Sequence, residues 1–226
     1  MNALASLIFH IKNLLLFFYP PHCTSCGIQI TQEELFCKPC FESIKPIASL
    51  CIPITDSHSL TVHAAARYDN PLRLLILKKH YTDAYASYQL GNVMAQTLNL
   101  ALLKADFLVP TPLHWTRYAI RGFNQAEIIA NILPKKMNIP VLKLCIRVHK
   151  TDFQAALTVE ERVANVRHVF AVAQAYKDKI KELVAGKHIV FVDDLYTTGS
   201  TLKSLARTIT HYKPAKLSAL VACRVP

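Results

Sequence analysis

Acidic residues are scarce in this sequence. Its 226 residues include 15 Asp and Glu against 26 Lys and Arg, which gives a net charge of +11. Such an excess is typical of proteins that bind polyanions, namely nucleic acid, an anionic membrane surface or phosphorylated small molecules. The alternative is a basic surface with no specialised partner. Because 52% of the residues are hydrophobic, the chain can still bury a full core, and we expect one domain with a small appendage.

The sequence also lacks an uninterrupted apolar run of the roughly 20 residues that a membrane span needs. Its most apolar stretch, residues 4–19, is interrupted by Lys12 and Asn13, follows no basic residue and precedes no small-residue cleavage site. Apolar residues recur in this stretch at helical spacing, which predicts an N-terminal helix. We expect this helix to pack on the protein body, with peripheral contact to a membrane surface as the alternative.

The cysteines lack the pattern of a disulfide framework. Four of the seven form two CxxC pairs ten residues apart: Cys23 with Cys26, and Cys37 with Cys40. Two CxxC turns supply four thiolates, which predicts a closed, tetrahedral and structural Zn2+ site in a reducing compartment. A redox role for the thiols is the alternative. We expect the other three cysteines to be buried as small apolar residues: Cys51, Cys145 and Cys223.

The chain is expected to have two parts. Residues 1–50 would hold the N-terminal helix and a four-cysteine zinc knuckle, and residues 51–226 a second domain that follows a linker at 46–59. Apolar periodicity in the second part predicts an alternation of strands and helices. The predicted strands are 60–68, 106–113, 141–148, 189–192 and 217–223. The predicted helices are 70–79, 91–103, 125–133 and 200–209.

A phosphate-binding pattern occupies residues 189–209. An unbroken β-branched run, typical of a strand buried in a parallel sheet, is followed by Asp193 and Asp194, a hydroxyl-rich turn and a helix. The turn at a helix N-terminus presents N–H groups and the positive end of the helix dipole, which together suit a phosphate. The acids suit sugar hydroxyls or Mg2+. The predicted phosphate-binding residues are Thr197, Thr198, Gly199, Ser200 and Thr201. An ordinary strand-to-helix connection is the alternative.

A second anion-binding turn is predicted after the strand at 106–113. Two prolines around Thr111 fix the backbone where the strand gives way to a loop. Arg117 and Arg121 follow, and guanidinium groups at the carboxyl edge of a sheet suit a pyrophosphate. Thr111 and Pro112 are therefore predicted to line this site with the two arginines. The alternative is that the arginines pair only with surface acids.

Three sequence features resemble a known family. The run VDDLYTTGST resembles the phosphoribosyl pyrophosphate (PRPP) loop of type I phosphoribosyltransferases. The four-cysteine knuckle and the run VPTPLHWTRYAIRGFNQA resemble the ComF family of phosphoribosyltransferase-like competence proteins. The same family has a lid-like segment whose spacing matches Arg147, Thr151, Gln154, Leu157, Arg162 and Asn165.

This resemblance implies an α/β fold of the type I phosphoribosyltransferase kind, with a mostly parallel sheet flanked by helices and an added zinc finger. Asp193, Asp194 and Arg162 become the candidate catalytic residues, with Asp193 and Asp194 holding Mg2+ through the ribose. Residues 150–170 would form a mobile lid that brings Arg162 and Gln154 to a bound pyrophosphate. Tyr196 replaces the aliphatic residue of purine-salvage relatives, which predicts a narrower base pocket.

The resemblance also implies a cytoplasmic role in DNA uptake during natural transformation, with single-stranded DNA and proteins of the uptake machinery as partners. A Mg2+-dependent phosphoribosyltransferase of nucleotide metabolism and a PRPP-sensing regulator remain the alternatives. We expect the basic residues to gather at the mouth of the site, where nearby aromatic rings are candidates for base stacking. The cations are Lys38, Arg117, Arg121, Arg147, Lys150 and Arg162, and the aromatics are Trp115, Phe123 and Phe153. The alternative is that these aromatics belong to the core.

Overall fold

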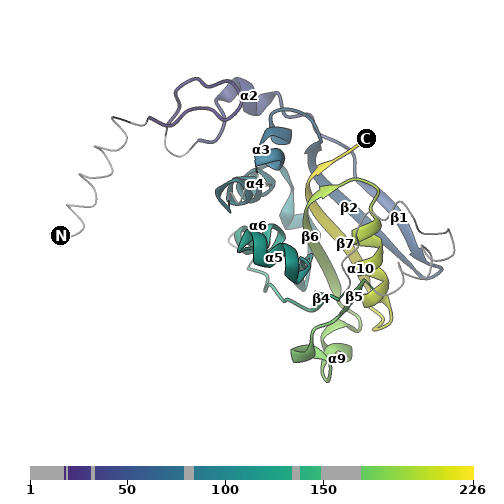
Figure 1. Ribbon diagram of the computed structural model, residues 1–226. Helices are drawn as coiled ribbons and strands as arrows, with labels where there is room; N and C mark the ends of the chain where they lie inside the picture. The colour runs from purple at the N-terminus through teal and green to yellow at the C-terminus, as the bar shows by residue number, and fades with distance from the viewer. Residues whose placement is uncertain (1–17, 19, 32–33, 79–83, 134–137, 149–168) are drawn as a thin grey trace, which may run out of the picture.

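The computed structural model describes residues 18, 20–31, 34–78, 84–133, 138–148 and 169–226. A five-stranded sheet lies at its centre, with the strand order β1-β2-β7-β6-β3 (Figure 1). β1 and β2 pair antiparallel and the other neighbours pair parallel, which confirms the predicted α/β fold with a mostly parallel sheet. The strand bounds are β1 Leu50–Thr55, β2 His58–Arg67, β3 Phe107–Pro110, β6 His188–Tyr196 and β7 Lys216–Arg224.

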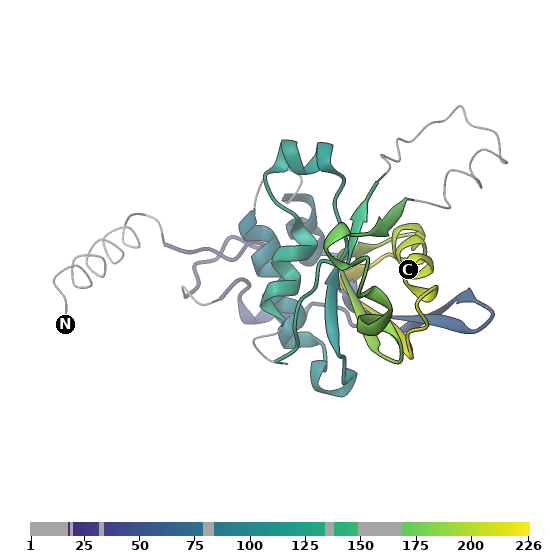
Figure 2. The ribbon, with the colours of Figure 1, turned by 90° about the horizontal axis from the view of Figure 1, so that it is seen from below.

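Helices cover both faces of this sheet (Figures 1 and 2). On one face lie α3 (Leu72–Lys78), α4 (Ala84–Thr97) and α6 (Gln125–Ile132), and on the other lies α10 (Ser200–Thr210). Successive side chains of a strand point to opposite faces. Phe191 of β6 therefore joins the core under α10, whereas Val190 and Val192 join the core under α4 and α6. Burial on both faces is the reason for the unbroken apolar run in the sequence.

The order of the strands sets the position of the candidate site. β3 and β6 are adjacent and parallel, so both strands end at the same edge of the sheet. The proline-rich turn that follows β3 and the hydroxyl-rich turn that follows β6 therefore emerge next to each other. A hydrogen bond from the Thr111 amide to the Val192 carbonyl, 2.9 Å long, links the two strand ends directly.

A short helix that the periodicity does not predict follows β3. Helix α5 (Trp115–Arg121) has no buried residue, and Gly122 ends it in the left-handed conformation with φ of 77°. Apolar periodicity marks helices that bury one face. The sequence of α5 shows no apolar periodicity because this helix lies on the surface (Figure 2).

Several predicted bounds are wrong. The supposed linker at 46–59 contains β1, which forms a hairpin with β2, and Cys51 is exposed because it lies on the outward side of this edge strand. Helix α4 begins at Ala84 and ends at Thr97, and a 3-10 helix, Leu100–Leu103, follows it. The predicted helix at 91–103 therefore spans two elements, because apolar residues occur in the sequence on both sides of the break between them. Cys145 and Cys223 are buried as expected.

The predicted strand at 141–148 is also shorter than expected. Val141 makes only an isolated bridge to Leu108 of β3, and the chain then leaves the central sheet. Strand β4 (Cys145–Arg147) pairs instead with β5 (Phe170–Val172) in a separate two-stranded sheet. Helix α9 (Ile180–Val184) leads from there to β6.

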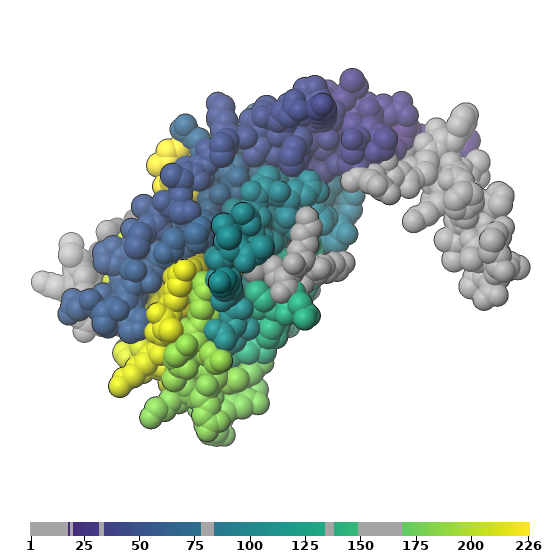
Figure 3. All heavy atoms as spheres, turned by 180° about the vertical axis from the view of Figure 1, so that it is seen from behind, coloured from purple at the N-terminus to yellow at the C-terminus, as the bar shows by residue number. Residues whose placement is uncertain are grey.

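The four-cysteine knuckle packs on the helices of the main sheet. Its short helix α2 (Lys38–Glu42) follows Phe36, which is buried in the same core as Leu75 of α3 and Leu90 of α4. In Figure 3 this purple and blue part covers one end of the molecule. The division of the chain at residue 50 stays a prediction. The predicted helix at 4–19 lies outside the described residues, except for Phe18.

Among the helices that the structure describes, none has the length and apolar composition of a membrane span.

Candidate functional site

The hydroxyl-rich turn between β6 and α10 has the geometry of an anion cradle. Gly199 adopts a left-handed conformation with φ of 73° and stands at the N-cap of α10, where it offers no side-chain cap. The Thr198 hydroxyl oxygen accepts a hydrogen bond from the Ser200 amide at 3.4 Å, and the hydroxyl donates to the Ser200 hydroxyl at 3.2 Å. The first turn of α10 therefore presents N–H groups and hydroxyls around one point, as phosphate binding requires.

The side chain of Tyr196 packs against this turn. Its side chain is 7% exposed and lies so close to Gly199 that a Cβ at this glycine would come within 2.6 Å of two ring carbons. The ring thus fixes the path of the backbone between the acid pair and α10. Tyr196 was predicted to narrow a base pocket. Its contact with Gly199 was not predicted, because residues three positions apart at a strand end meet only if the turn folds back.

The acid pair lies within β6 rather than after it. β6 continues to Tyr196 because Asp193, Leu195 and Tyr196 pair with β7. Both carboxylates are partly exposed, and Asp193 Oδ1 accepts a hydrogen bond of 2.9 Å from the Asp194 amide. Neighbouring residues of a strand face opposite sides of the sheet. The pair can address one ligand here because β3 ends at Pro110, opposite Val192, so that β6 has no partner among the described strands on this side at the acid pair.

Arginines from two other elements accompany the acid pair. Burial lowers the pKa of Arg121 from its ordinary value, the nearby Arg117 lowers it further, and Asp194 opposes both. Burial likewise lowers the pKa of Arg147 on β4, again with a contribution from Arg117 and with Asp193 opposing. The Arg117 guanidinium is thus close enough to repel those of both Arg121 and Arg147. Because arginine stays charged at neutral pH, this cluster favours an anionic ligand.

The turn after β3 is locked by the residues of the RGFNQ run. Asn124 Nδ2 donates to the Thr111 carbonyl at 3.0 Å, and Asn124 Oδ1 accepts from the Ala126 amide at 3.1 Å, which caps α6. His114 caps α5 in the same way by accepting from the Thr116 amide. The predicted site residues Thr111 and Pro112 are thereby held at the carboxyl edge of the sheet, next to the acid pair.

Two buried polar atoms at this edge have no hydrogen-bond partner among the described residues. They are Thr111 Oγ1, in a residue 7% exposed, and Gln125 Nε2, in a residue 3% exposed. An unpaired buried donor costs roughly 1–3 kcal/mol, so such groups are uncommon unless they serve a ligand or solvent. Gln125 was predicted only as the start of a helix. Its polarity at a buried helix position is the signal that could have identified it.

The structure brings together most of the predicted site residues. The acid pair, the turn at 197–201, Thr111, Pro112 and the arginines of α5 all lie at the carboxyl ends of β3 and β6. Arg147, which was predicted to line the mouth and to belong to the lid-like segment, interacts electrostatically with Asp193. The predicted lid at 150–170 lies outside the described residues, except for residues 169 and 170. The lid residues predicted to contact pyrophosphate or DNA therefore also lie outside them: Lys150, Phe153, Gln154 and Arg162.

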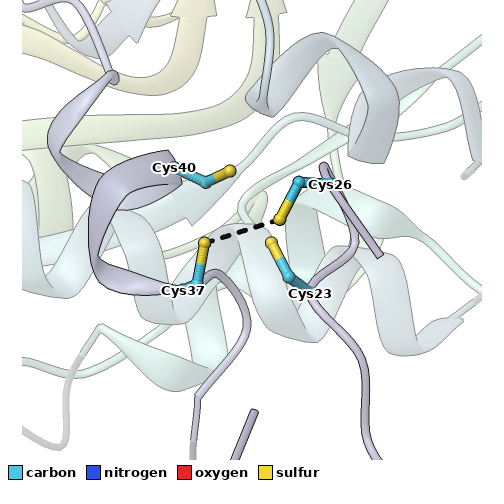
Figure 4. A group of neighbouring side chains, drawn as sticks. All are labelled: Cys23, Cys26, Cys37 and Cys40. Carbon is cyan, nitrogen blue, oxygen red and sulfur yellow. Dashed lines mark hydrogen bonds between the residues drawn. The ribbon is translucent and has the colours of Figure 1, made fainter. Parts of the chain in front are cut away.

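The four predicted metal ligands meet at a separate place (Figure 4). The Sγ atoms of the four knuckle cysteines all lie within 4.8 Å of one another, and Cys26 Sγ is 3.6 Å from Cys37 Sγ. Zn–S bonds of about 2.3 Å in a tetrahedron place sulfur atoms about 3.8 Å apart, so the donor set fits zinc. With four ligands from the chain, no coordination position stays open for catalysis.

Comparison with known proteins gives a consistent picture. Residues 119–226 match the family model described as "Phosphoribosyl transferase domain". Competence protein F of Haemophilus influenzae is 26% identical, over 84% of this chain and 78% of that protein. Competence protein ComFC of Bacillus subtilis is 25% identical, over 89% of this chain and 94% of that protein. DNA utilization protein YhgH of Escherichia coli is 27% identical, over 89% of this chain and 83% of that protein.

A crystal structure from Thermus thermophilus matches with a TM-score of 0.36 and 13% identity, over 62% of this chain and 83% of that one. A likeness of this size carries no argument about fold or function.

Proposed function

We propose that this chain is a member of the ComF family of type I phosphoribosyltransferase-like proteins, that it binds PRPP or a related ribose 5-phosphate with Mg2+, and that it uses this site in DNA uptake. One observation carries the proposal. A phosphate-type turn, two carboxylates and three arginines from separate segments of the chain converge on the same edge of the sheet. A sugar phosphate carries the complementary groups, namely a phosphate, vicinal hydroxyls and a second anionic group.

Each part of such a ligand has a candidate partner. The hydroxyls of Thr197, Thr198 and Thr201 and the amides at the start of α10 would hold the 5′-phosphate. Asp193 and Asp194 would accept hydrogen bonds from the ribose hydroxyls. Arg117, Arg121 and Arg147 would neutralise the pyrophosphate, and the Thr111 hydroxyl is a donor at the same edge. The roles of Arg162 and Gln154 at the pyrophosphate stay predictions.

The donor set at the acid pair fits Mg2+ only in part. Carboxylate oxygens are the hard ligands that this ion prefers. Among the described residues, however, only the knuckle brings three or more metal-binding side chains together. Asp193 and Asp194 would therefore hold Mg2+ together with oxygens of the ribose and pyrophosphate, and the bound ion would supply charge neutralisation. Mg2+ and ligand are expected to bind together.

Removing both carboxylates tests this proposal. In the variant Asp193→Ala with Asp194→Ala, we expect PRPP affinity in the presence of Mg2+ to fall tenfold or more, because each charged hydrogen bond is worth about 1.5–3 kcal/mol. Isothermal titration calorimetry gives the affinity. Asp178→Ala is the matched control, since Asp178 is exposed and precedes α9 at the opposite edge of the sheet. Unchanged affinity in the double variant would contradict the assignment of the site.

The relatives' names connect the family with competence and DNA utilization. We infer a cytoplasmic role in handling single-stranded DNA, which fits the net charge of +11. Support comes from α5, where Trp115 is 71% exposed and Tyr118 51% exposed beside Arg117 and Arg121. Trp115 is therefore not a core residue, which excludes the alternative that all of these aromatic residues belong to the core. Phe123 is partly buried.

The dependence of strand binding on salt concentration distinguishes contacts made by the arginines of α5 from general charge attraction. Replacing Arg117 and Arg121 with alanine is expected to weaken the binding of an oligothymidylate and to reduce the slope of log K against log salt by about 1.4, at about 0.7 per phosphate contact. Fluorescence anisotropy at several salt concentrations measures both. Lys177→Ala with Lys179→Ala removes the same charge from exposed positions before α9 and should change little. Equal effects of the two double variants would indicate general charge attraction.

A further inference from the structure

The carboxylates and the arginines of the site come from different elements, which has consequences for a nucleic acid strand. The carboxylates belong to β6, directly before the phosphate turn. The arginines belong to α5 and β4, where Arg121 interacts electrostatically with Asp194 and Arg147 with Asp193. A nucleotide whose 5′-phosphate occupies the turn would present its ribose hydroxyls to the carboxylates, as the proposed function requires.

A strand inside such a site meets an electrostatic restriction. Every internal nucleotide carries a phosphodiester on its 3′ oxygen, and this group would lie against Asp193 and Asp194. Like charges held this close repel one another, and they do so more strongly in a partly buried site than in bulk water. Only the last nucleotide of a strand has a free 3′-hydroxyl, which can donate a hydrogen bond to a carboxylate instead.

We propose that the ribose-phosphate site captures the 3′-terminal nucleotide of single-stranded nucleic acid, with α5 as a stacking platform for bases. The inference rests on the proposed function, because it uses the same turn and acid pair. The strand would thus be bound with a defined polarity and by its end.

Helix α5 has the side-chain arrangement that a platform needs. Residues three or four positions apart share one side of a helix. Trp115 and Tyr118 therefore share one side, and Arg117 and Arg121 share another. Arg121 is partly buried and interacts electrostatically with Asp194, so its side of the helix faces the site, whereas Trp115 and Tyr118 are exposed. Aromatic rings beside cations are the common means of binding single strands without regard to sequence.

Oligothymidylates of about 12 nucleotides, a usual length for such sites, provide the test. Three strands with an internal fluorophore would carry a 3′-hydroxyl, a 3′-phosphate or a 5′-phosphate, and anisotropy would be measured without added Mg2+. We expect the 3′-phosphate to weaken binding at least fivefold and the 5′-phosphate not to weaken it. General attraction to a basic protein predicts the opposite, since either phosphate adds negative charge. A 3′-phosphate strand that binds equally well or better would overturn the proposal.

Two variants locate the effect. In Asp193→Asn with Asp194→Asn, the preference for the 3′-hydroxyl should disappear because the repelling charges are gone. Trp115→Ala with Tyr118→Ala should weaken all three strands about tenfold. Ile120→Ala is the matched control, since Ile120 is 77% exposed on the same helix but offers no ring. A preference that persists in the asparagine variant, or an equal loss in the Ile120 variant, would also contradict the proposal.

Ribose 5-phosphate binding, measured on the same preparations, distinguishes failure of the end-capture proposal from failure of the proposed function. If ribose 5-phosphate binds and the strands show no end preference, the end-capture proposal fails alone. If ribose 5-phosphate does not bind either, the proposed function fails with it.

Discussion

Replacing Gly199 with alanine is expected to abolish most of the affinity for ribose 5-phosphate and to destabilise the protein. A non-glycine residue in the left-handed conformation costs about 1–2 kcal/mol. The new Cβ would also lie within 2.6 Å of the Tyr196 ring, and overpacking of this kind costs about 1–3 kcal/mol. The sum of about 2–5 kcal/mol must be relieved by moving the turn. We expect affinity to fall more than tenfold, which calorimetry would measure together with thermal unfolding.

Gly186→Ala is the matched control for this experiment. Gly186 has φ of 70°, close to the 73° of Gly199, but a Cβ there would meet nothing within 4 Å. This variant should lose only the stability that a non-glycine residue in the left-handed conformation costs, about 1–2 kcal/mol, and should keep its ligand affinity. Tyr196→Leu in the Gly199→Ala background should recover part of the loss, because it removes the clashing ring. Equal effects of the two glycine variants would show that Tyr196 does not hold the turn.

Replacing Cys37 with serine is expected to remove zinc and to unfold the knuckle. The proposed zinc ion needs all four thiolates, and a segment this small has little core of its own. Phe36 would then lose its place against α3 and α4, and its burial alone contributes roughly 2–3 kcal/mol. Elemental analysis should find one zinc per chain in the parent protein and none in the variant, and hydrogen exchange at residues 34–44 should accelerate.

The chain supplies a matched control for this variant as well. Cys51 is exposed on β1 and lies outside the cluster, so Cys51→Ser should keep zinc and stability. Ribose 5-phosphate binding should survive in Cys37→Ser, because the turn and acid pair belong to β6 and α10. Parent protein that contains no zinc when purified without chelator would refute the assignment of the metal.

The sequence alone predicted the parts of the site that are local in the chain. The turn from Asp193 to Thr201 is contiguous, and its chemistry follows from a buried strand, two acids and a helix N-terminus in that order. The CxxC pairs are local for the same reason, because each pair places two thiols on one turn. The short apolar run at 189–192 likewise predicted that β6 is a strand buried on both faces of a parallel sheet.

The tertiary structure decided which distant residues join that turn. Arg147 neighbours Asp193 because β4 leaves the central sheet to pair with β5, a pairing between residues distant in sequence. Helix α5 left no periodic pattern because it buries no face, and its position follows from the adjacency of β3 and β6. The contact of Tyr196 with Gly199 depends on the turn folding back over the strand end. Local order along the chain specifies which groups are available, whereas strand pairing and burial, which act across long separations, determine which of them meet.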